Sequence, residues 1–296
     1  MLKPYELLEN VLLEIDKNIK EGVNSIELAE KFDLSDRHLR RLFKFAFNIS
    51  LGEYIRSRKL ALSLDDLLQK DFNVIDVAFE YGFEHETSYN RSFKREFGIT
   101  PGDMRKKGHI VKVKPPLNLF DENKLGENLF FGPDIVFVPQ FHIIGKKYTL
   151  EFNDFISKAQ KVALKFWENE RLQIKNTVNK NVYFGYTKNI NLQTTSIDYM
   201  PSIQVKNFNN VPQGYSKDTF ETSLCAKFRY IGERCNYYEL DHNIIHSISN
   251  EAMKFNSNEN IKYTLLNHKI CFEKVNISQN DGTYCQIEWF TPVQKK

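Results

Sequence analysis

The sequence predicts two domains, an all-helical N-terminal domain followed by an α+β domain built on an antiparallel sheet. The chain has 296 residues, a length that suits two domains, each with its own core. Up to residue 108, apolar side chains recur every three or four positions, which is the period of a helix. From residue 131, β-branched and aromatic residues dominate, and the order strand, helix, strand, strand occurs twice. We therefore expect domains at 1–108 and 131–296.

The first part of the helical domain has the order helix, short helix, turn, longer helix. The expected elements are a helix over 5–19, a short helix over 26–32, a turn at 33–35 and a helix over 36–47. In the last helix the apolar residues fall at i, i+3, i+4 and i+7 and should face the core. They are Leu39, Leu42, Phe43 and Ala46. A short helix, a tight turn and a longer helix form a helix-turn-helix unit.

A long helix over 51–69 leads to a second unit of the same order. Its parts are a short helix over 74–81, a turn at Gly82-Phe83 and a helix that carries Tyr89, Phe93 and Phe97 on one face. Gly98 is suited to end this helix, and Thr100 with Pro101 is suited to begin the next one. The chain thus carries two helix-turn-helix units joined by one helix.

These two units resemble the DNA-binding domain of the AraC/XylS family of transcription regulators. The resemblance covers residues 5–108 and depends on IDVAFEYGF at 75–83, FKREFG at 93–98 and TPGDMR at 100–105. It implies that each recognition helix enters a major groove of promoter DNA, about one helical turn (~34 Å) apart.

The predicted DNA contacts lie on the outward faces of the two recognition helices. The resemblance places base-facing positions at Arg37, Arg40, Arg41, Glu86, Thr87, Asn90 and Arg91. Their polar and basic neighbours complete the set and are His38, Lys44, Ser88, Lys94 and Arg95. Arginine can fork onto guanine and asparagine onto adenine. The alternative is an ordinary solvated face on a helical bundle.

Total charge does not indicate nucleic-acid binding, because residues 1–108 hold 18 Lys and Arg against 19 Asp and Glu. The local clusters of basic residues on the two helices carry the prediction instead, since phosphate contacts depend on local charge.

No metal, cofactor or disulfide framework is expected. His38 and His85 have no further ligands at fitting spacing, and we interpret both as phosphate contacts or surface residues. The cysteines at 225, 235, 271 and 285 lack C-x-x-C spacing and are expected to be buried free thiols. No run approaches the roughly 20 apolar residues of a membrane span, and the N-terminal segment intersperses charges, so we expect a cytoplasmic protein.

Residues 109–130 are the predicted linker. Pro115 and Pro116 disfavour a continued helix, and the polar segment that follows contains Gly126.

The second domain is expected to hold two β-α-β-β units. The first has strands within 133–150, a helix over 152–171 and strands at 181–189 and 197–208. The second has paired strand segments within 214–233, a helix around 241–255 and strands at 268–275 and 282–293. This order predicts helices on one face of an antiparallel sheet and a free, groove-forming opposite face.

This arrangement resembles the GyrI-like effector-binding domain over residues 131–296. The segments that carry the resemblance are FVPQFHIIGKK, VPQG at 211–214, AKFRYIGE, CFEKV at 271–275 and IEWFTPV. It implies a ligand pocket with Glu288 on the last strand and Glu273 at a second acidic position.

Strand alternation places Glu288 beside aromatic residues, independently of the resemblance. Tyr284, Gln286, Glu288 and Phe290 share one strand face, while Cys285, Ile287 and Trp289 share the other. A carboxylate beside aromatic rings can hold an organic cation. The predicted effector-binding residues are Glu288, Glu273, Tyr186, Tyr199, Tyr284, Trp289 and Phe290. The alternative is that both glutamates are solvated on an open sheet.

The sequence therefore predicts a regulator that binds promoter DNA and senses a small amphipathic molecule, cationic or aromatic. Two alternatives stay open. The second domain could be a small-molecule hydrolase, in which a glutamate positions water, or it could bind a protein such as a topoisomerase or RNA polymerase.

Overall fold

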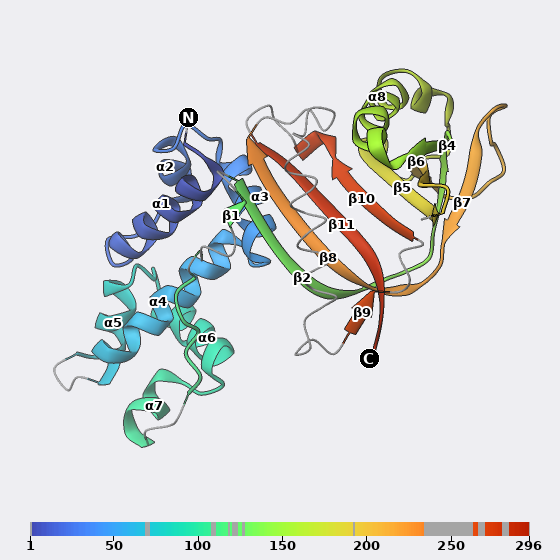
Figure 1. Cartoon of the computed structure of the whole chain (residues 1–296). Coiled ribbons are helices and arrows are strands. Elements are labelled where there is room, and N and C mark those ends of the chain that lie inside the picture. The colour runs from blue at the N-terminus through green and yellow to red at the C-terminus, as the bar shows by residue number, and fades with distance from the viewer. Residues whose placement is uncertain are drawn as a thin grey trace. The chain divides into compact units, whose positions relative to one another are not determined.

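The chain separates into two compact units, residues 1–120 and 121–296 (Figure 1). The structure is a computed structural model that describes residues 2–68, 72–107, 111–117, 119, 124–125, 128–191, 193–233, 263–265, 270–279 and 284–295. The domain limits predicted at 108 and 131 remain predictions.

The first unit is helical, as the sequence predicts. Its helices are α1 (Pro4–Lys17), α2 (Ser25–Glu30), α3 (Asp36–Phe47), α4 (Leu51–Leu68), α5 (Val74–Glu80), α6 (Glu86–Phe97) and α7 (Pro101–Lys107). The side chain of Ser35 caps α3 by accepting a hydrogen bond from the His38 amide at 3.2 Å. Gly98 ends α6 in the left-handed conformation with φ of 77°.

The apolar faces expected on the two longer helices form the cores of the helix-turn-helix units. On α3, Leu39, Leu42 and Phe43 are fully buried. On α6, Tyr89 and Phe93 are fully buried and Phe97 packs against the same cluster. Helix α4 contacts α3 of the first helix-turn-helix motif and α5, α6 and α7 of the second, so it joins the two motifs.

The second unit is an antiparallel sheet with a helix on one face. Its elements are β1 (Lys124–Leu125), β2 (Asn128–Val138), β3 (Phe141–Gly145), β4 (Tyr148–Glu151), α8 (Phe155–Glu168), β5 (Val182–Asn191), β6 (Ser196–Val205), β7 (Ser216–Phe220), β8 (Ser223–Glu233), β9 (Tyr263–Leu265), β10 (Ile270–Asn276) and β11 (Tyr284–Lys295). The strand order is β1-β2-β8-β11-β10-β5-β6-β3-β7, with β4 on β6 and β9 on β11. The helix predicted around 241–255 lies outside the described residues.

The expected pairing of β7 with β8 is wrong. Strand β7 pairs with β3, whereas β8 pairs with β2 and β11, so the two consecutive strands lie in different parts of the sheet. The turn between them therefore redirects the chain and does not form a hairpin. The internal duplication of the β-α-β-β unit is not confirmed.

Both faces of the sheet are apolar, although only one was expected to be. One face packs against α8 in a cluster that includes Phe166, Tyr183 and Ile287. The opposite face was expected to be free to form a groove, but it carries a second buried cluster that includes Phe272 and Phe290. Alternate residues of each central strand therefore enter different cores.

The cysteines differ in state. Cys225 and Cys271 are free thiols, as expected. Cys285 is disulfide-bonded, so the expectation of a free thiol there is wrong. Spacing along the chain could not reveal this, because the pairing of a cysteine depends on the fold.

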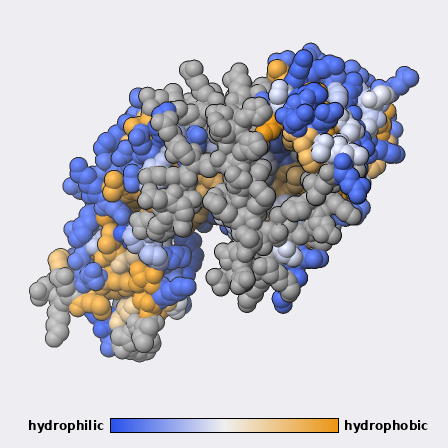
Figure 2. All heavy atoms as spheres, in the orientation of Figure 1, coloured by the Kyte–Doolittle hydropathy of each residue, from blue (hydrophilic) through white to orange (hydrophobic). Residues whose placement is uncertain are grey.

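The surface of the first unit carries an apolar patch in the region of α5 (Figures 1 and 2). Its exposed side chains on and just before α5 are Leu68, Phe72, Ile75 and Phe79. Within the described part of the chain, no helix combines the length and the apolar character needed to cross a membrane.

Replacing Phe166 on α8 by Ala should destabilise the second unit strongly. Phe166 is fully buried in the helix-facing cluster, so Phe166→Ala should lower the free energy of unfolding by about 3–5 kcal/mol. Both tryptophans of the chain, Trp167 and Trp289, lie in this unit, and their fluorescence in urea reports its unfolding. Phe137, which is 66% exposed, provides the control, because Phe137→Ala should change stability by about 0.5 kcal/mol or less. Equal losses in the two variants would contradict the assigned core.

Candidate functional site

The outward face of α3 presents basic side chains to solvent. Arg37, Arg40 and Lys44 are exposed, whereas Arg41 is half-buried. The guanidinium of Arg40 donates to Asp36 at 2.8 Å, one turn earlier on the same helix, and also to Ser25. Asp36 and Ser25 therefore compete with DNA for the Arg40 guanidinium.

His38 does not lie on this face. Its side chain is only 3% exposed, so the expectation of a phosphate contact or a surface position is wrong. His38 falls beside Leu39 and Leu42 on the buried arc of α3, where helical periodicity already placed the core.

The outward face of α6 is more mixed. Thr87, Ser88, Arg91, Lys94 and Arg95 are exposed. Glu86 and Asn90 are half-buried, and the amide of Asn90 donates to Glu86 at 3.2 Å. The side chains of Glu86 and Asn90 are hydrogen-bonded to each other. The exposed side chains of α6 are therefore the ones free to enter a groove of DNA. Every predicted contact except His38 thus keeps at least part of its surface.

The predicted effector-binding residues lie on two opposite faces of the sheet and do not form one site. On β10 and β11, Glu273 lies opposite Trp289, and Lys274 lies opposite Glu288. Cross-strand partners share a face and neighbours along a strand do not. The residues on the α8 side are Glu273, Tyr199 and Trp289. The residues on the opposite side are Glu288, Tyr186, Tyr284 and Phe290.

Glu288 is neutralised by lysines. It forms ion pairs with Lys227 and with Lys274, the latter at 3.2 Å. Burial alone would raise the pKa of Glu288, but Lys274 and Lys227 outweigh that effect and hold the pKa below its usual value. The ammonium of Lys227 also lies over the Phe290 ring at 5.8 Å. The cationic partner that the sequence analysis sought in a ligand is therefore supplied by the protein.

Glu273 has a different environment, on the helix-facing side. The hydroxyl of Tyr199 donates to its carboxylate at 3.0 Å, and Tyr199 in turn contacts the hydroxyl of Tyr183 at 2.6 Å. Burial raises the pKa of Glu273 to about 7, against the hydrogen bonds from Tyr199 and Trp289, which lower it. Among the described residues, no lysine or arginine forms an ion pair with Glu273.

A glycine provides the space for this carboxylate. Gly185 on β5 lies opposite Glu273 in the register, and a Cβ at position 185 would overlap the Glu273 carboxylate. The carboxylate can therefore lie flat against the sheet, close to the tyrosine hydroxyl. The ring of Phe155 at the start of α8 meets Tyr199 edge-on at 5.7 Å and adds an aromatic wall.

The second unit has two cavities whose lining consists mostly of residues that the sequence analysis missed. One has a volume of about 140 Å³ and includes Tyr186 and Tyr199 in its lining. The other has a volume of about 740 Å³, within the range of organic-ligand sites, and is lined by Lys188, Phe208, Lys217, Asp218, Thr219, Phe220, Glu221, Thr222, Ser223, Ile270 and Pro292. Lys188 and Asp218, an ion pair of 3.0 Å, line both cavities. Most of these residues lie on or around β7, whose position depends on its distant pairing with β3, so no local sequence signal marked them.

Two predicted effector residues, Tyr186 and Tyr199, line the smaller cavity. Of these two, Tyr186 has a hydroxyl without a hydrogen-bond partner among the described residues. It is 2% exposed, and its hydroxyl has no hydrogen-bond partner within the described structure. Three or more His, Cys, Asp or Glu side chains do not come together as metal ligands anywhere in the described ranges.

Comparisons with known proteins match both units. A family described as "Helix-turn-helix domain" matches residues 28–107, and a family described as "Integron-associated effector binding protein" matches residues 134–293, more than half of the chain. The probable transcription factor PqrA of Proteus vulgaris is 35% identical over 108 residues, which are 34% of this chain and 88% of PqrA. The regulatory protein SoxS of Salmonella typhimurium is 32% identical over 100 residues, which are 34% of this chain and 94% of SoxS. The crystal structure of an integron cassette protein from Vibrio cholerae covers 56% of this chain and 99% of its own, with 14% identity and a TM-score of 0.42.

The pKa of Glu273 predicts how stability depends on pH. A pKa of about 7 in the folded protein lies above the ordinary value of 4.5, so the folded state binds this proton more tightly than the unfolded state does. The resulting stabilisation is complete below pH 4.5 and is lost as the pH rises through 7. Relative to Glu273→Gln, the wild-type second unit should lose roughly 2–3 kcal/mol of unfolding free energy between pH 4.5 and 8. Urea unfolding followed by tryptophan fluorescence measures this difference, and parallel pH profiles for the two proteins would refute it.

Proposed function

We propose a sensing mechanism for this chain, which belongs to the integron-associated effector binding protein family and carries an AraC-type helix-turn-helix region ahead of that domain. The protein is a DNA-binding transcription regulator with an effector-binding domain. The proposal concerns its effector, which we infer to be a small organic cation with aromatic or other apolar groups, bound through Glu273.

The observation that supports this proposal is the contrast between the two glutamates. Glu288 already has two lysine partners. Glu273 has hydroxyl and indole hydrogen-bond partners, but no cation among the described residues. A half-buried carboxylate without a counter-ion gains electrostatic energy from a ligand cation, because the dielectric around it is lower than that of water. Aromatic rings around it add cation–π attraction.

A bound cation would compete with a proton. With its pKa raised to about 7, Glu273 is protonated in part of the population at neutral pH. A cation binds the ionised carboxylate, so its binding displaces that proton. Affinity should therefore fall as the pH drops below 7.

Regulation requires that the effector prefers one state of the protein. A ligand changes DNA binding only when its affinity differs between two arrangements of the chain. Glu273 lies between β5, β11 and the start of α8, so its ionisation would change the packing of Tyr199 against Phe155. We propose that this contact is the element the effector shifts.

The remaining expectations follow from the same proposal. We assign binding and not catalysis to Glu273, in keeping with relatives that are transcription regulators. A cytoplasmic location and a contact with RNA polymerase at the promoter complete the proposed function. Hydrolysis and protein binding by the second unit have no specific observation in their favour.

Removing one exposed arginine from either recognition helix should weaken binding to a cognate site. Arg37 on α3 and Arg91 on α6 are both exposed, and neither forms an ion pair with a described residue. Arg37→Ala and Arg91→Ala should each cost about 1–3 kcal/mol of binding free energy, and each should relax specificity in its own half of the site. The measurement is fluorescence anisotropy with selected duplexes, and Lys17→Ala on the exposed side of α1 is the control. Unchanged affinity and unchanged footprints in both variants would exclude these helices as readers.

The two glutamates give a matched test of the sensor. Benzyltrimethylammonium and a neutral benzyl ether of similar size are titrated into the full chain by calorimetry. Glu273→Gln should weaken the cation about 10–100-fold, the value of a hydrogen-bonded charge contact, and should leave the neutral compound nearly unchanged. Glu288→Gln should leave both unchanged.

Two results would count against this assignment. One is equal loss of the cation in both variants, and the other is loss in Glu288→Gln alone, which would transfer the site to the opposite face. In the wild type, cation affinity should also fall up to about tenfold for each pH unit below 7. A flat profile would show that Glu273 does not exchange a proton for the ligand.

A further inference from the structure

The first part of the predicted linker lies against the helical unit. Residues 111–117 and 119, which we call the strap, have no regular secondary structure, and they belong to the same compact unit as the helices. Pro115 and Pro116 favour an extended backbone in this segment. An extended segment makes no hydrogen bonds to itself, so the contacts of the strap are contacts with the helices.

The N-terminal end of the strap is bound to the second helix-turn-helix motif. Val111 packs against the apolar cluster formed by α4, α5, α6 and α7. The ammonium of Lys114 forms an ion pair of 2.7 Å with Glu96, in the last turn of α6. Glu96 also accepts a hydrogen bond of 2.8 Å from the hydroxyl of Ser57 on α4. Burial alone would raise the pKa of Glu96, but the hydrogen bonds from Lys114 and Ser57 hold the pKa below its usual value.

The C-terminal end of the strap is bound beside the first motif. The backbone amide of Leu117 donates to the hydroxyl of Tyr54 on α4 at 3.3 Å. The ring of Tyr54 is buried and packs against Phe43 of α3, with 5.4 Å between the ring centres. The hydroxyl of Tyr5 on α1 donates to the carbonyl oxygen of Leu119 at 3.4 Å. The strap therefore contacts α6 at one end, and at the other end a tyrosine that packs on α3.

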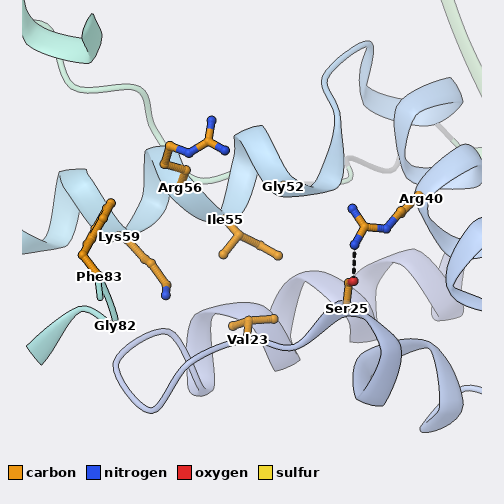
Figure 3. Close-up of a pocket in the computed structure, with 9 residues that line it drawn as sticks. All are labelled: Val23, Ser25, Arg40, Gly52, Ile55, Arg56, Lys59, Gly82 and Phe83. Atoms are coloured by element: carbon orange, nitrogen blue, oxygen red, sulfur yellow. Dashed lines mark hydrogen bonds between the residues drawn. The ribbon is translucent and has the colours of Figure 1, made fainter. Parts of the chain in front are cut away.

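Helix α4 has the strap on one side and a cavity of about 220 Å³ on the other. On α4 the cavity is lined by Ile55, Arg56 and Lys59, whereas Tyr54 and Ser57 project from the opposite arc, because consecutive residues of a helix point about 100° apart. In Figure 3 the start of α2 and the turn of the second motif border the same cavity. The cavity separates the two motifs on this side, and the strap connects them on the other.

We propose that the strap holds the two recognition helices in the relative arrangement that a two-part DNA site requires, so that strap docking and DNA affinity are linked. Contacts of α3 and α6 with successive major grooves require a fixed spacing between the helices. An arrangement that is held before binding costs less conformational entropy when DNA binds. Release of the strap leaves each recognition helix intact and loosens only the connection between them.

The inference rests on DNA binding by the helical unit and does not depend on the effector assigned to Glu273. The chain continues from the strap into the second unit. The strap is therefore also the covalent path between the effector-binding domain and the recognition helices.

The test uses the full chain with a release variant and a matched control. The release variant combines Tyr5→Phe, Tyr54→Phe and Lys114→Met, which remove three polar contacts of the strap and keep both aromatic rings. The control, Lys112→Met, removes the same charge from an exposed lysine of the strap that forms no ion pair with a described residue. A thermal melt checks that each variant is folded. A complete duplex is selected with the wild type from a random library, and two further duplexes each keep one half of it.

In the first arm, fluorescence anisotropy gives the affinity for each duplex. The release variant should bind the complete duplex about tenfold more weakly than Lys112→Met does, because each lost hydrogen bond contributes a factor of about 2 to 10 to docking. Its affinity for each half-site duplex should match that of Lys112→Met.

In the second arm, amide hydrogen exchange reports docking of the strap directly. In the wild type, the complete duplex should slow exchange of the Leu117 amide by a similar factor, because linkage between two equilibria is reciprocal. Neither half-site duplex should slow it. In the release variant without DNA, this amide should exchange faster than in Lys112→Met.

Three results would overturn the proposal. The first is a release variant that has a faster Leu117 amide and still binds the complete duplex as Lys112→Met does. The second is an equal loss on the complete and half-site duplexes, which would show damage within one motif. The third is a complete duplex that leaves Leu117 exchange in the wild type unchanged, and this result decides alone if the variant does not release the strap. None of the three bears on cation binding through Glu273, which calorimetry tests separately.

Discussion

The antiparallel register between β10 and β11 decides what each of the two central glutamates can do. It places Glu273 opposite Trp289, and Lys274 opposite Glu288. Since side chains alternate across a strand, one carboxylate faces α8 and the other faces the second core. A slip of β11 by one residue would turn Glu288 to the α8 face and away from Lys227 and Lys274. The separate electrostatic states of Glu273 and Glu288 both follow from this pairing.

The helical unit obeys a similar rule with a different period. Side chains spaced by three and four on α3 and α6 are buried, and basic side chains on the remaining arc are exposed. His38 belongs to the buried arc although exposed Arg37 precedes it, because consecutive residues of a helix point about 100° apart. In both units, the regular geometry of the backbone decides which side chains are buried in the core and which are available for binding.

Local patterns predicted the helices of the first unit and most of the longer strands of the second. The limits of α3 and the end of α6 at Gly98 follow from capping and turn residues. Alternation along β11 correctly separated Ile287 from Phe290. Long-range facts could not be read in this way. The lysines that neutralise Glu288 come from β8 and β10, the pairing of β7 with β3 crosses the chain, and the disulfide state of Cys285 depends on the fold.

The two recognition helices of the helical unit are not equivalent, and α4 connects them. Helix α4 has 18 residues, about 27 Å at 1.5 Å per residue, and it joins two recognition helices whose exposed side chains differ. The two helix-turn-helix motifs of one chain therefore present different exposed side chains, joined in a fixed order by α4. Exchanging the two motifs would not give back the same unit, so the helical unit has no internal two-fold symmetry.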